Sequence, residues 1–265
     1  MGLETVALFA RTSGSADHPP LLLLHGLLGS GRNWQTAAAD LAATGRSIHA
    51  LDLRNHGKSP WHPVMSYEAM AADVLAWLDA RNLGPVELMG HSMGGKVAML
   101  LATRHPGRFR RLIVVDIAPK SYLSHGHRAE FAAMNELRLD TLQSRGEAEM
   151  KLEGRVPDWG MRKFLTTNLE RDDAGAWRWT VNLPVLTAAL PELEANSLDP
   201  AASYRSPTLF VRGGKSRYIT EADYTTIAGI FPAARIATIA TSGHNPHMET
   251  RAEFSAEVSA FLTGD

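Results

Sequence analysis

The chain has 265 residues, of which 45% are hydrophobic and 21% charged, an ordinary composition for a globular protein of about one to two domains. Its formal net charge of −1 gives no bulk attraction to nucleic acid or anionic lipid, and the absence of cysteine excludes disulfides, thiolate metal sites and a cysteine nucleophile. No stretch approaches the ~18 consecutive apolar residues of a membrane span, and no basic run precedes an apolar stretch at the N-terminus. We therefore expect no membrane insertion and no signal peptide, and the lack of cysteine fits the reducing cytoplasm.

Short apolar runs alternate along the chain with segments of helical period. The runs are apolar on both faces, as buried parallel strands are. Those predicted as strands are 21–26, 47–53, 86–90, 111–117, 206–214 and 234–240. The segments predicted as helices are 31–43, 66–82, 93–105, 220–231 and 250–263. The alternation predicts an α/β protein with helices on both faces of a parallel sheet, to which residues 3–11 could add an antiparallel edge strand.

Residues 119–203 break this alternation. They are rich in helix formers and contain no convincing strand, and Pro157, Pro184, Pro191 and Pro200 divide them into short pieces. We interpret them as a helical cap, or lid, inserted into a core made of residues 1–118 and 204–265. For the cap residues His125 and His127 a surface role is favoured over metal binding.

The stretch VELMGHSMGGKVAM (86–99) places Ser92 between two glycines, after an apolar strand and before a helix. Gly90-His91-Ser92-Met93-Gly94 fits the G-x-S-x-G pattern, in which the serine occupies a strained strand-to-helix turn. A side chain at either glycine would collide with the neighbouring strand or helix. The pattern predicts that Ser92 is a nucleophile; a glycine-rich turn with a buried serine is the alternative.

A serine hydroxyl needs a general base to take its proton. His244 lies in ATSGHNPH, after the last apolar run and before the final helix, which puts it at the carboxyl edge of the sheet with Ser92. The chain order, nucleophile first and histidine last, also fits. His247 is the rival, but the glycine before His244 frees the backbone to aim that ring.

An oxyanion site needs backbone N–H groups near the nucleophile. LLLLHGLLGSGRNW (21–34) joins a buried strand to a helix, and Leu27 follows the end of that strand. In a fold of this kind the loop supplies one donor and the residue after the serine supplies the other. We expect the N–H groups of Leu27 and Met93 to fill these roles; a plain turn is the alternative for the loop.

Several of these motifs together resemble the α/β-hydrolase fold superfamily, and especially the small bacterial carboxylesterases and their mitochondrial relatives. They are HGLLGSGRNW, DLRNHGKSP, GHSMGGKVAM, VVDIAP and SGHNPHMET. The resemblance spans about residues 4 to 263. It implies an eight-stranded, mostly parallel sheet, a helical cap after strand six, and hydrolysis of short acyl esters without a cofactor. In DLRNHGKSP we expect Asp52, Arg54, Gly57 and Ser59 to form a hydrogen-bonded turn beside the site.

The sequence departs from the superfamily pattern at the third triad residue. Members usually carry an aspartate after strand seven, where this chain reads RGGKSRYIT and Ser216 stands in its place. A serine cannot stabilise an imidazolium as a carboxylate does. Asp116, at the end of the strand that follows the Ser92 helix, lies at the same sheet edge, and the esterase subgroup retains it. We predict Asp116 as the acid; the alternatives are that it caps the strand, or that Asp223, more consistent with a surface residue, is involved.

These parts predict a serine hydrolase of carboxylic esters with short to medium acyl chains, acting through an acyl-enzyme. Candidates for the substrate pocket are His91, Phe131, Trp159, Trp179, Leu183 and Tyr218, although cap packing is the simpler reading of each cap side chain. The same machinery could cleave a thioester, a lactone or a C–C bond, and a binding scaffold without turnover is a further alternative. We expect a small-molecule ester as the partner, no nucleic acid, no metal, and a monomer or homodimer.

Overall fold

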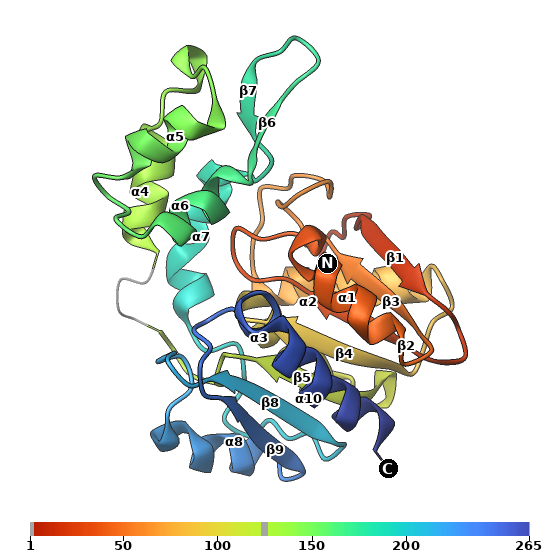
Figure 1. Cartoon of the computed structure of the whole chain (residues 1–265). Coiled ribbons are helices and arrows are strands. Elements are labelled where there is room, and N and C mark those ends of the chain that lie inside the picture. The colour runs from red at the N-terminus through yellow and green to blue at the C-terminus, as the bar shows by residue number, and fades with distance from the viewer. Residues whose placement is uncertain (1–2, 123–126, 265) are drawn as a thin grey trace.

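A seven-stranded sheet forms the centre of the computed structural model, which describes residues 3–122 and 127–264 (Figure 1). The strand order is β1-β3-β2-β4-β5-β8-β9, and neighbouring strands are parallel except for the antiparallel pair β1 and β3. The strands are β1 (Ala10–Gly14), β2 (His18–Leu24), β3 (Arg46–Leu51), β4 (Val86–His91), β5 (Phe109–Val115), β8 (Thr208–Gly213) and β9 (Ala234–Ile239). The predicted α/β class and its six parallel strands are confirmed.

The expected count of eight strands is wrong for the described residues, because the first part of the N-terminal segment does not join the sheet. Its backbone groups bond mainly to side chains: the N–H of Val6 donates to Asp73 Oδ1 at 2.8 Å, and the N–H of Phe9 donates to Ser59 Oγ at 2.9 Å. The antiparallel edge strand begins only at Ala10, later than the pattern of residues 3–11 indicated.

Helices cover both faces of the sheet because its central strands are apolar on both sides. Along β2, Leu21 and Leu23 pack in the cluster that includes α1 and α10, whereas Leu22 and Leu24 pack in the cluster that includes α2 and α3. Figure 1 shows α1 and α10 in front of the sheet. The core helices are α1 (Gln35–Ala42), α2 (Tyr67–Asp79), α3 (Met93–Arg104), α8 (Tyr224–Ile230), α9 (Pro246–Glu249) and α10 (Arg251–Thr263), with short 3-10 turns η1 (Gly31–Trp34), η2 (Pro106–Arg108) and η4 (Glu221–Asp223).

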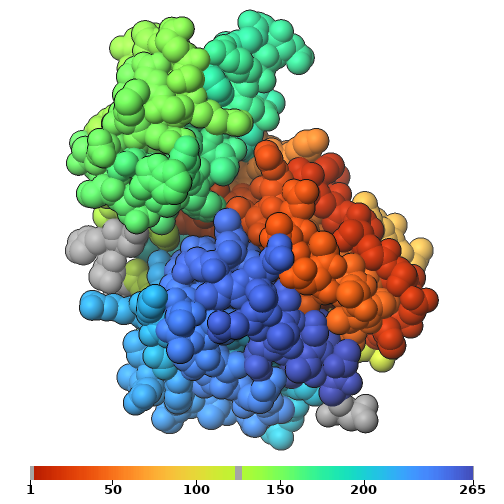
Figure 2. All heavy atoms as spheres, viewed as in Figure 1, coloured from red at the N-terminus to blue at the C-terminus, as the bar shows by residue number. Residues whose placement is uncertain are grey.

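The segment between β5 and β8 forms a separate layer above the carboxyl edge of the sheet, seen in green in Figures 1 and 2. Its elements are α4 (Arg128–Glu136), η3 (Leu139–Thr141), α5 (Arg145–Leu152), α6 (Trp159–Thr166), β6 (Leu169–Arg171), β7 (Trp177–Trp179) and α7 (Leu183–Glu194). Most of these elements are helices, as the composition of the segment predicted. The two-stranded hairpin β6–β7 corrects the expectation that the cap has no strand: each strand has three residues, too few for an alternating pattern to be visible in the sequence.

Two asparagines of this cap segment bond directly to loops of the core. Asn168 Nδ2 donates to the carbonyl of Leu28 at 2.8 Å. The backbone N–H of Asn182 donates to the carbonyl of Asn55 at 2.9 Å, and its side-chain amide donates to Asn55 Oδ1 at 3.1 Å. The cap is therefore tied by hydrogen bonds to the loops that follow β2 and β3.

Candidate active site

Ser92 lies in a sharp turn between β4 and α3, with φ of +51° and ψ of −118°. A positive φ is costly for a residue with a side chain and persists only where the surroundings impose it. The surroundings here are glycines: a Cβ at Gly90 would overlap the carbonyl oxygen of Gly94, and a Cβ at Gly94 would lie 2.5 Å from the carbonyl oxygen of Leu24 in β2. The predicted steric reason for both glycines is confirmed.

Three loops that are distant in the sequence bring Ser92, His244 and Asp116 together. His244 Nε2 lies 3.1 Å from Ser92 Oγ, and its Nδ1 lies 2.8 Å from Asp116 Oδ2. In this arrangement Nδ1–H donates to the carboxylate and Nε2 accepts from the hydroxyl. The rival base, His247, instead stacks on Trp34 with ring centroids 4.2 Å apart, and burial lowers its pKa to about 3.

Asp116 is fully buried and has a positive φ of +49°. Its Oδ1 accepts from the N–H of Gly213 at 3.0 Å, while its Oδ2 accepts from both His244 Nδ1 and Ser216 Oγ. Ser216, at the position where the resemblance led us to expect an aspartate, therefore donates a hydrogen bond to the carboxylate of Asp116, which follows the neighbouring strand β5. The other acidic candidate, Asp223, pairs with Lys120 at 2.7 Å.

The His244 loop is held from two sides. The ring of Tyr218 stacks on the His244 ring at 3.8 Å with an angle of 16° between the planes. His91 Nε2 donates to the backbone carbonyl of His244 at 2.8 Å. Burial, followed by the charges of nearby histidines, lowers the pKa of His91 well below its ordinary value, so its ring is neutral at pH 7. His91, predicted as a substrate contact, thus also fixes the loop that carries His244.

Two buried histidines fix the loop that contains Leu27. His25 Nδ1 donates to the carbonyl of Gly26 at 2.8 Å, and His25 Nε2 accepts from the N–H of Leu53 at 2.9 Å. His56 Nε2 accepts from the N–H of Leu28 at 3.3 Å. Burial lowers the pKa of His25 to about 4 and that of His56 to about 3, so each neutral ring donates at one nitrogen and accepts at the other. The loop after β2 is thereby linked to the loop after β3.

The predicted turn in DLRNHGKSP is confirmed. The carboxylate of Asp52 accepts from the N–H of Gly31 at 2.7 Å and from the N–H of Lys58 at 2.8 Å. Arg54 forms a fully buried ion pair with Asp73, with Nε and Oδ2 2.6 Å apart. A Cβ at Gly57 would overlap the Asp52 carboxylate, which explains the glycine.

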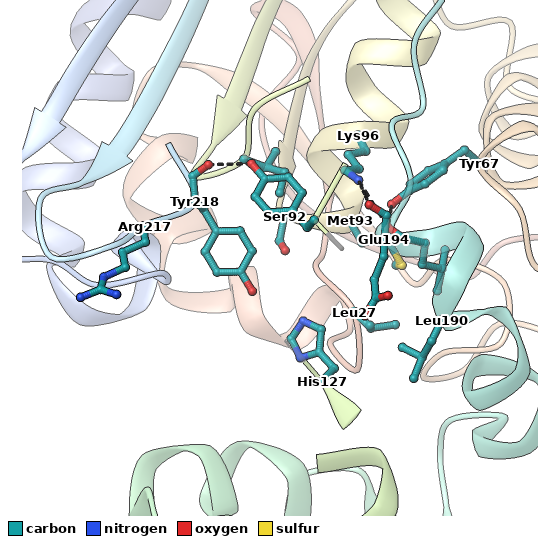
Figure 3. Close-up of a pocket in the computed structure, with 13 residues that line it drawn as sticks. Leu27, Tyr67, Ser92, Met93, Lys96, His127, Leu190, Glu194, Arg217 and Tyr218 are labelled. Carbon is teal, nitrogen blue, oxygen red and sulfur yellow. Dashed lines mark hydrogen bonds between the residues drawn. The ribbon is translucent and has the colours of Figure 1, made fainter. Parts of the chain in front are cut away.

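Two cavities meet at Ser92. The first, which we call the Lys96 cavity, has a volume of about 240 Å³ and is mainly apolar (Figure 3). Its lining residues are Leu27, Tyr67, Ser92, Met93, Lys96, Ile117, Tyr122, His127, Leu190, Leu193, Glu194, Arg217 and Tyr218. The second, which we call the His244 cavity, has a volume of about 430 Å³ and includes Leu27, His91, Ser92, His127, Glu130, Met161, Phe164, His244 and Met248. Leu27 and Met93, the predicted oxyanion residues, both line a cavity that reaches Ser92.

Four of the six residues predicted for the substrate pocket lie elsewhere. Phe131, Trp179 and Leu183 are buried in the large hydrophobic cluster that runs from the cap to one face of the sheet, and Trp159 is 63% exposed. None of the four lines the two cavities at Ser92. Phe131, Trp179 and Leu183 are used for packing in this cluster, which is why they do not face the site, whereas Trp159 faces solvent.

The pocket residues that the sequence analysis missed come from α3 and the cap. Leu190 and Leu193 of α7 face the Lys96 cavity, and His127 lines both cavities instead of lying on the surface. His125, its predicted companion, lies outside the described residues. The spacing of Leu190 and Leu193 on one face of α7 was a visible signal, but it did not distinguish a pocket from a core.

Lys96 joins the helix of the nucleophile to the end of α7. Its ammonium donates to the backbone carbonyls of Leu193, Glu194 and Ala195, the last at 2.5 Å. These carbonyls belong to the C-terminal turn of α7, where no helical N–H group follows to pair with them. Burial lowers the pKa of Lys96 to about 8. This contact holds one wall of the Lys96 cavity against α3.

Within residues 3–122 and 127–264, no group of three or more histidine, cysteine, aspartate or glutamate side chains could hold a metal ion. No helix in the same part of the chain is long and apolar enough to cross a membrane.

The fold and the sequence relatives together define the class of this protein. The alpha/beta hydrolase fold family matches residues 19–149. The chain is 37% identical over 255 residues to the "sn-1-specific diacylglycerol lipase ABHD11" of Danio rerio, covering 94% of this chain and 80% of the relative. It therefore belongs to the alpha/beta hydrolase fold family.

Further relatives narrow the class. The "Esterase YbfF" of Escherichia coli strain K12 is 37% identical over 233 residues, covering 88% of this chain and 89% of the relative. The solved structure of a "Marine microorganism esterase" is 35% identical, covers 97% of this chain and 100% of its own, and superposes with a TM-score of 0.94. Within the family, this chain is an esterase/lipase-type hydrolase, an enzyme of the carboxylesterase type.

Proposed function

We propose that this enzyme hydrolyses carboxylic esters with short to medium acyl chains through an acyl-enzyme on Ser92. The observation that carries the proposal is the continuous hydrogen-bonded chain from Ser92 Oγ through His244 to Asp116. A serine activated in this way attacks acyl carbon, and an adjacent base oriented by a carboxylate is the arrangement that such attack requires.

The catalytic steps follow from the hydrogen bonds that link Ser92, His244 and Asp116. His244 Nε2 removes the proton of Ser92 Oγ as the oxygen attacks the ester carbonyl, and the N–H groups of Leu27 and Met93 stabilise the oxyanion. His244 then gives the proton to the departing alcohol, leaving the acyl group on Ser92. Water, deprotonated by His244, attacks the acyl-enzyme and releases the acid, while Asp116 stabilises the imidazolium in both halves of the reaction.

The two cavities suggest where the parts of the ester bind. The Lys96 cavity is mainly apolar and suits the acyl chain. Its volume of about 240 Å³ is below the ~300–1,000 Å³ of pockets for drug-sized ligands, which supports a short to medium chain. The leaving alcohol must lie near the general acid, and His244 lines the other cavity. We therefore assign the alcohol portion to the His244 cavity.

The remaining parts of the proposal concern partners and location. The partner is a small-molecule ester, bound by a monomer or homodimer without nucleic acid. A cytoplasmic location is consistent with a chain that has no cysteine.

A panel of p-nitrophenyl esters of increasing acyl length tests the proposal. We expect kcat/KM to be highest for short to medium chains and to fall roughly tenfold or more at palmitate, because overfilling a packed cavity costs about 1–3 kcal/mol. Ser92→Ala is expected to lower kcat by about 10⁶-fold. A diacylglycerol should be added to the panel of substrates, since one relative is named an "sn-1-specific diacylglycerol lipase". No turnover of any ester by the wild-type enzyme, or equal turnover by Ser92→Ala, would contradict the proposal.

A further inference from the structure

His127 occupies a position that the catalytic chain does not explain. Three described residues line both cavities at Ser92: Leu27, Ser92 itself and His127. The first two belong to the core, whereas His127 precedes α4 of the cap. Figure 3 shows its ring across the cavity from Ser92, below the side chain of Tyr218 and beside Leu27. The junction of the two cavities is where the scissile ester must lie, so His127 faces it from the cap.

The ring of His127 is available to a ligand. Burial, and secondarily the charge of His244, lower the pKa of His127 to about 4, so the imidazole is neutral at pH 7. A neutral imidazole offers one N–H donor and one nitrogen acceptor. No side chain or backbone group within the described ranges forms a hydrogen bond with this ring. A polar ring that faces this junction, with no partner among the described residues, is suited to bind a polar group of the substrate.

The neighbouring side chains indicate which part of the substrate this is. Glu130, one turn further along α4, also lines the His244 cavity, and burial raises the pKa of its carboxyl group. This face of α4 therefore places two hydrogen-bonding side chains over the cavity assigned to the alcohol portion. The Lys96 cavity, on the acyl side, is lined by His127 and by no residue of α4 itself.

We propose that His127 is a specificity-determining residue that hydrogen-bonds to an oxygen on the alcohol portion, close to the scissile bond. Esters of hydroxylated alcohols are then preferred over esters of plain alkyl alcohols. This inference rests on the proposed ester hydrolysis at Ser92. It also couples the cap to the chemistry, since the contact comes from the N-terminal end of α4 in the cap and the reacting atoms lie on the core.

A pair of esters of nearly equal shape tests the assignment. 2-Hydroxyethyl butyrate and propyl butyrate differ by a hydroxyl in place of a terminal methyl. In His127→Phe, which keeps a ring without its hydrogen bonds, we expect the ratio of their kcat/KM values to fall about two- to twelvefold, the worth of one neutral hydrogen bond. His127→Gln, which retains a donor and an acceptor, should restore part of the preference. A merely structural role would lower both values together and leave the ratio unchanged.

The control is His105→Phe, which makes the same change at an exposed histidine after α3 and should leave the ratio at its wild-type value. If His127→Phe does not fold, His127→Leu removes the same hydrogen bonds. An unchanged ratio in an active, folded His127 variant would overturn the inference. Failure of the proposed function is distinguishable, because the wild-type enzyme would then hydrolyse neither ester and its serine would not react with a fluorophosphonate.

Discussion

The assignment of Asp116 makes a demanding prediction. The substitution Asp116→Asn keeps the size of the side chain but removes the charge that stabilises the His244 imidazolium, and it presents an amide that can donate a hydrogen bond toward Nδ1. The tautomer with the proton on Nε2 is then favoured, and that nitrogen can no longer accept from Ser92. In serine proteases the equivalent loss lowers kcat by about 10⁴-fold, and we expect a loss of that order here with little change in KM.

Ser216 allows a complementary test, in which a carboxylate is added near His244 Nδ1 and not removed. Its hydroxyl and His244 Nδ1 both bond to Asp116 Oδ2, so position 216 is adjacent to the nitrogen that must be oriented. Ser216→Ala removes one of three hydrogen bonds to the carboxylate and should lower kcat/KM about tenfold. In the double variant Asp116→Asn with Ser216→Asp, a carboxylate is restored on the loop after β8, where the resemblance led us to expect one. We expect the double variant to recover about 10- to 100-fold over Asp116→Asn alone.

Hydrolysis of p-nitrophenyl butyrate, measured as separate kcat and KM values, checks both expectations, with urea unfolding to show that each variant is folded. Ser216→Ala is the matched control for a change of hydrogen bonding without loss of charge. Activity of Asp116→Asn above about a tenth of wild type would refute the assignment of the acid, since a factor of ten is only about 1.4 kcal/mol. If the double variant were no faster than Asp116→Asn, this would refute the claim that a carboxylate at position 116 or at position 216 can accept a hydrogen bond from His244 Nδ1.

Two further predictions concern stability. Gly94→Ala should lower the free energy of unfolding by about 3 kcal/mol or more, because the new Cβ would lie 2.5 Å from a β2 carbonyl oxygen; Gly229→Ala, in α8 with no heavy atom within 4 Å of the added Cβ, should instead stabilise by about 0.5–1 kcal/mol. Equal effects of the two substitutions in urea unfolding would contradict this steric account. The second prediction concerns acid. Burial lowers the pKa of His247 from 6.5 to about 3. Below pH 6.5 the unfolded chain therefore binds a proton at this ring, whereas the native protein does not. The free energy of unfolding consequently falls as the pH falls toward 3. His247→Phe keeps an aromatic ring to stack on Trp34. It should reduce the slope of the free energy of unfolding against pH by up to about 1.4 kcal/mol per pH unit between pH 6 and 4. An unchanged slope would show that the His247 ring is not held neutral.

Much of the sheet and of the site could be predicted from the sequence because both depend on local patterns. Buried parallel strands appear as apolar runs, and the carboxyl ends of such strands meet at one edge of the sheet. Ser92, Asp116 and His244 each lie at or after the end of one of these runs, so the strand pattern predicted one common edge for them, and the resemblance to the esterases favoured Asp116 as the acid. Gly90 and Gly94, on either side of Ser92, also predicted a tight turn from local sequence, because a side chain at either position would collide with its neighbours.

The cap was less predictable because its packing depends on contacts between distant residues. The strands of its hairpin are too short to show a period. Its aromatic residues Phe131 and Trp179 resembled pocket residues, but both are buried in the hydrophobic cluster that joins the cap to the core. Which face of α4 and α7 meets the site is decided by tertiary anchors such as Lys96 and Asn168, whose partners are backbone carbonyls that a sequence does not reveal.

The reaction of the enzyme with a fluorophosphonate, followed by mass spectrometry of its peptides, tests the central claim most directly. We expect one adduct per chain, on Ser92, which is lost in Ser92→Ala and forms much more slowly in Asp116→Asn. An adduct on a different residue, or continued ester hydrolysis by an enzyme whose Ser92 stays unmodified, would contradict it.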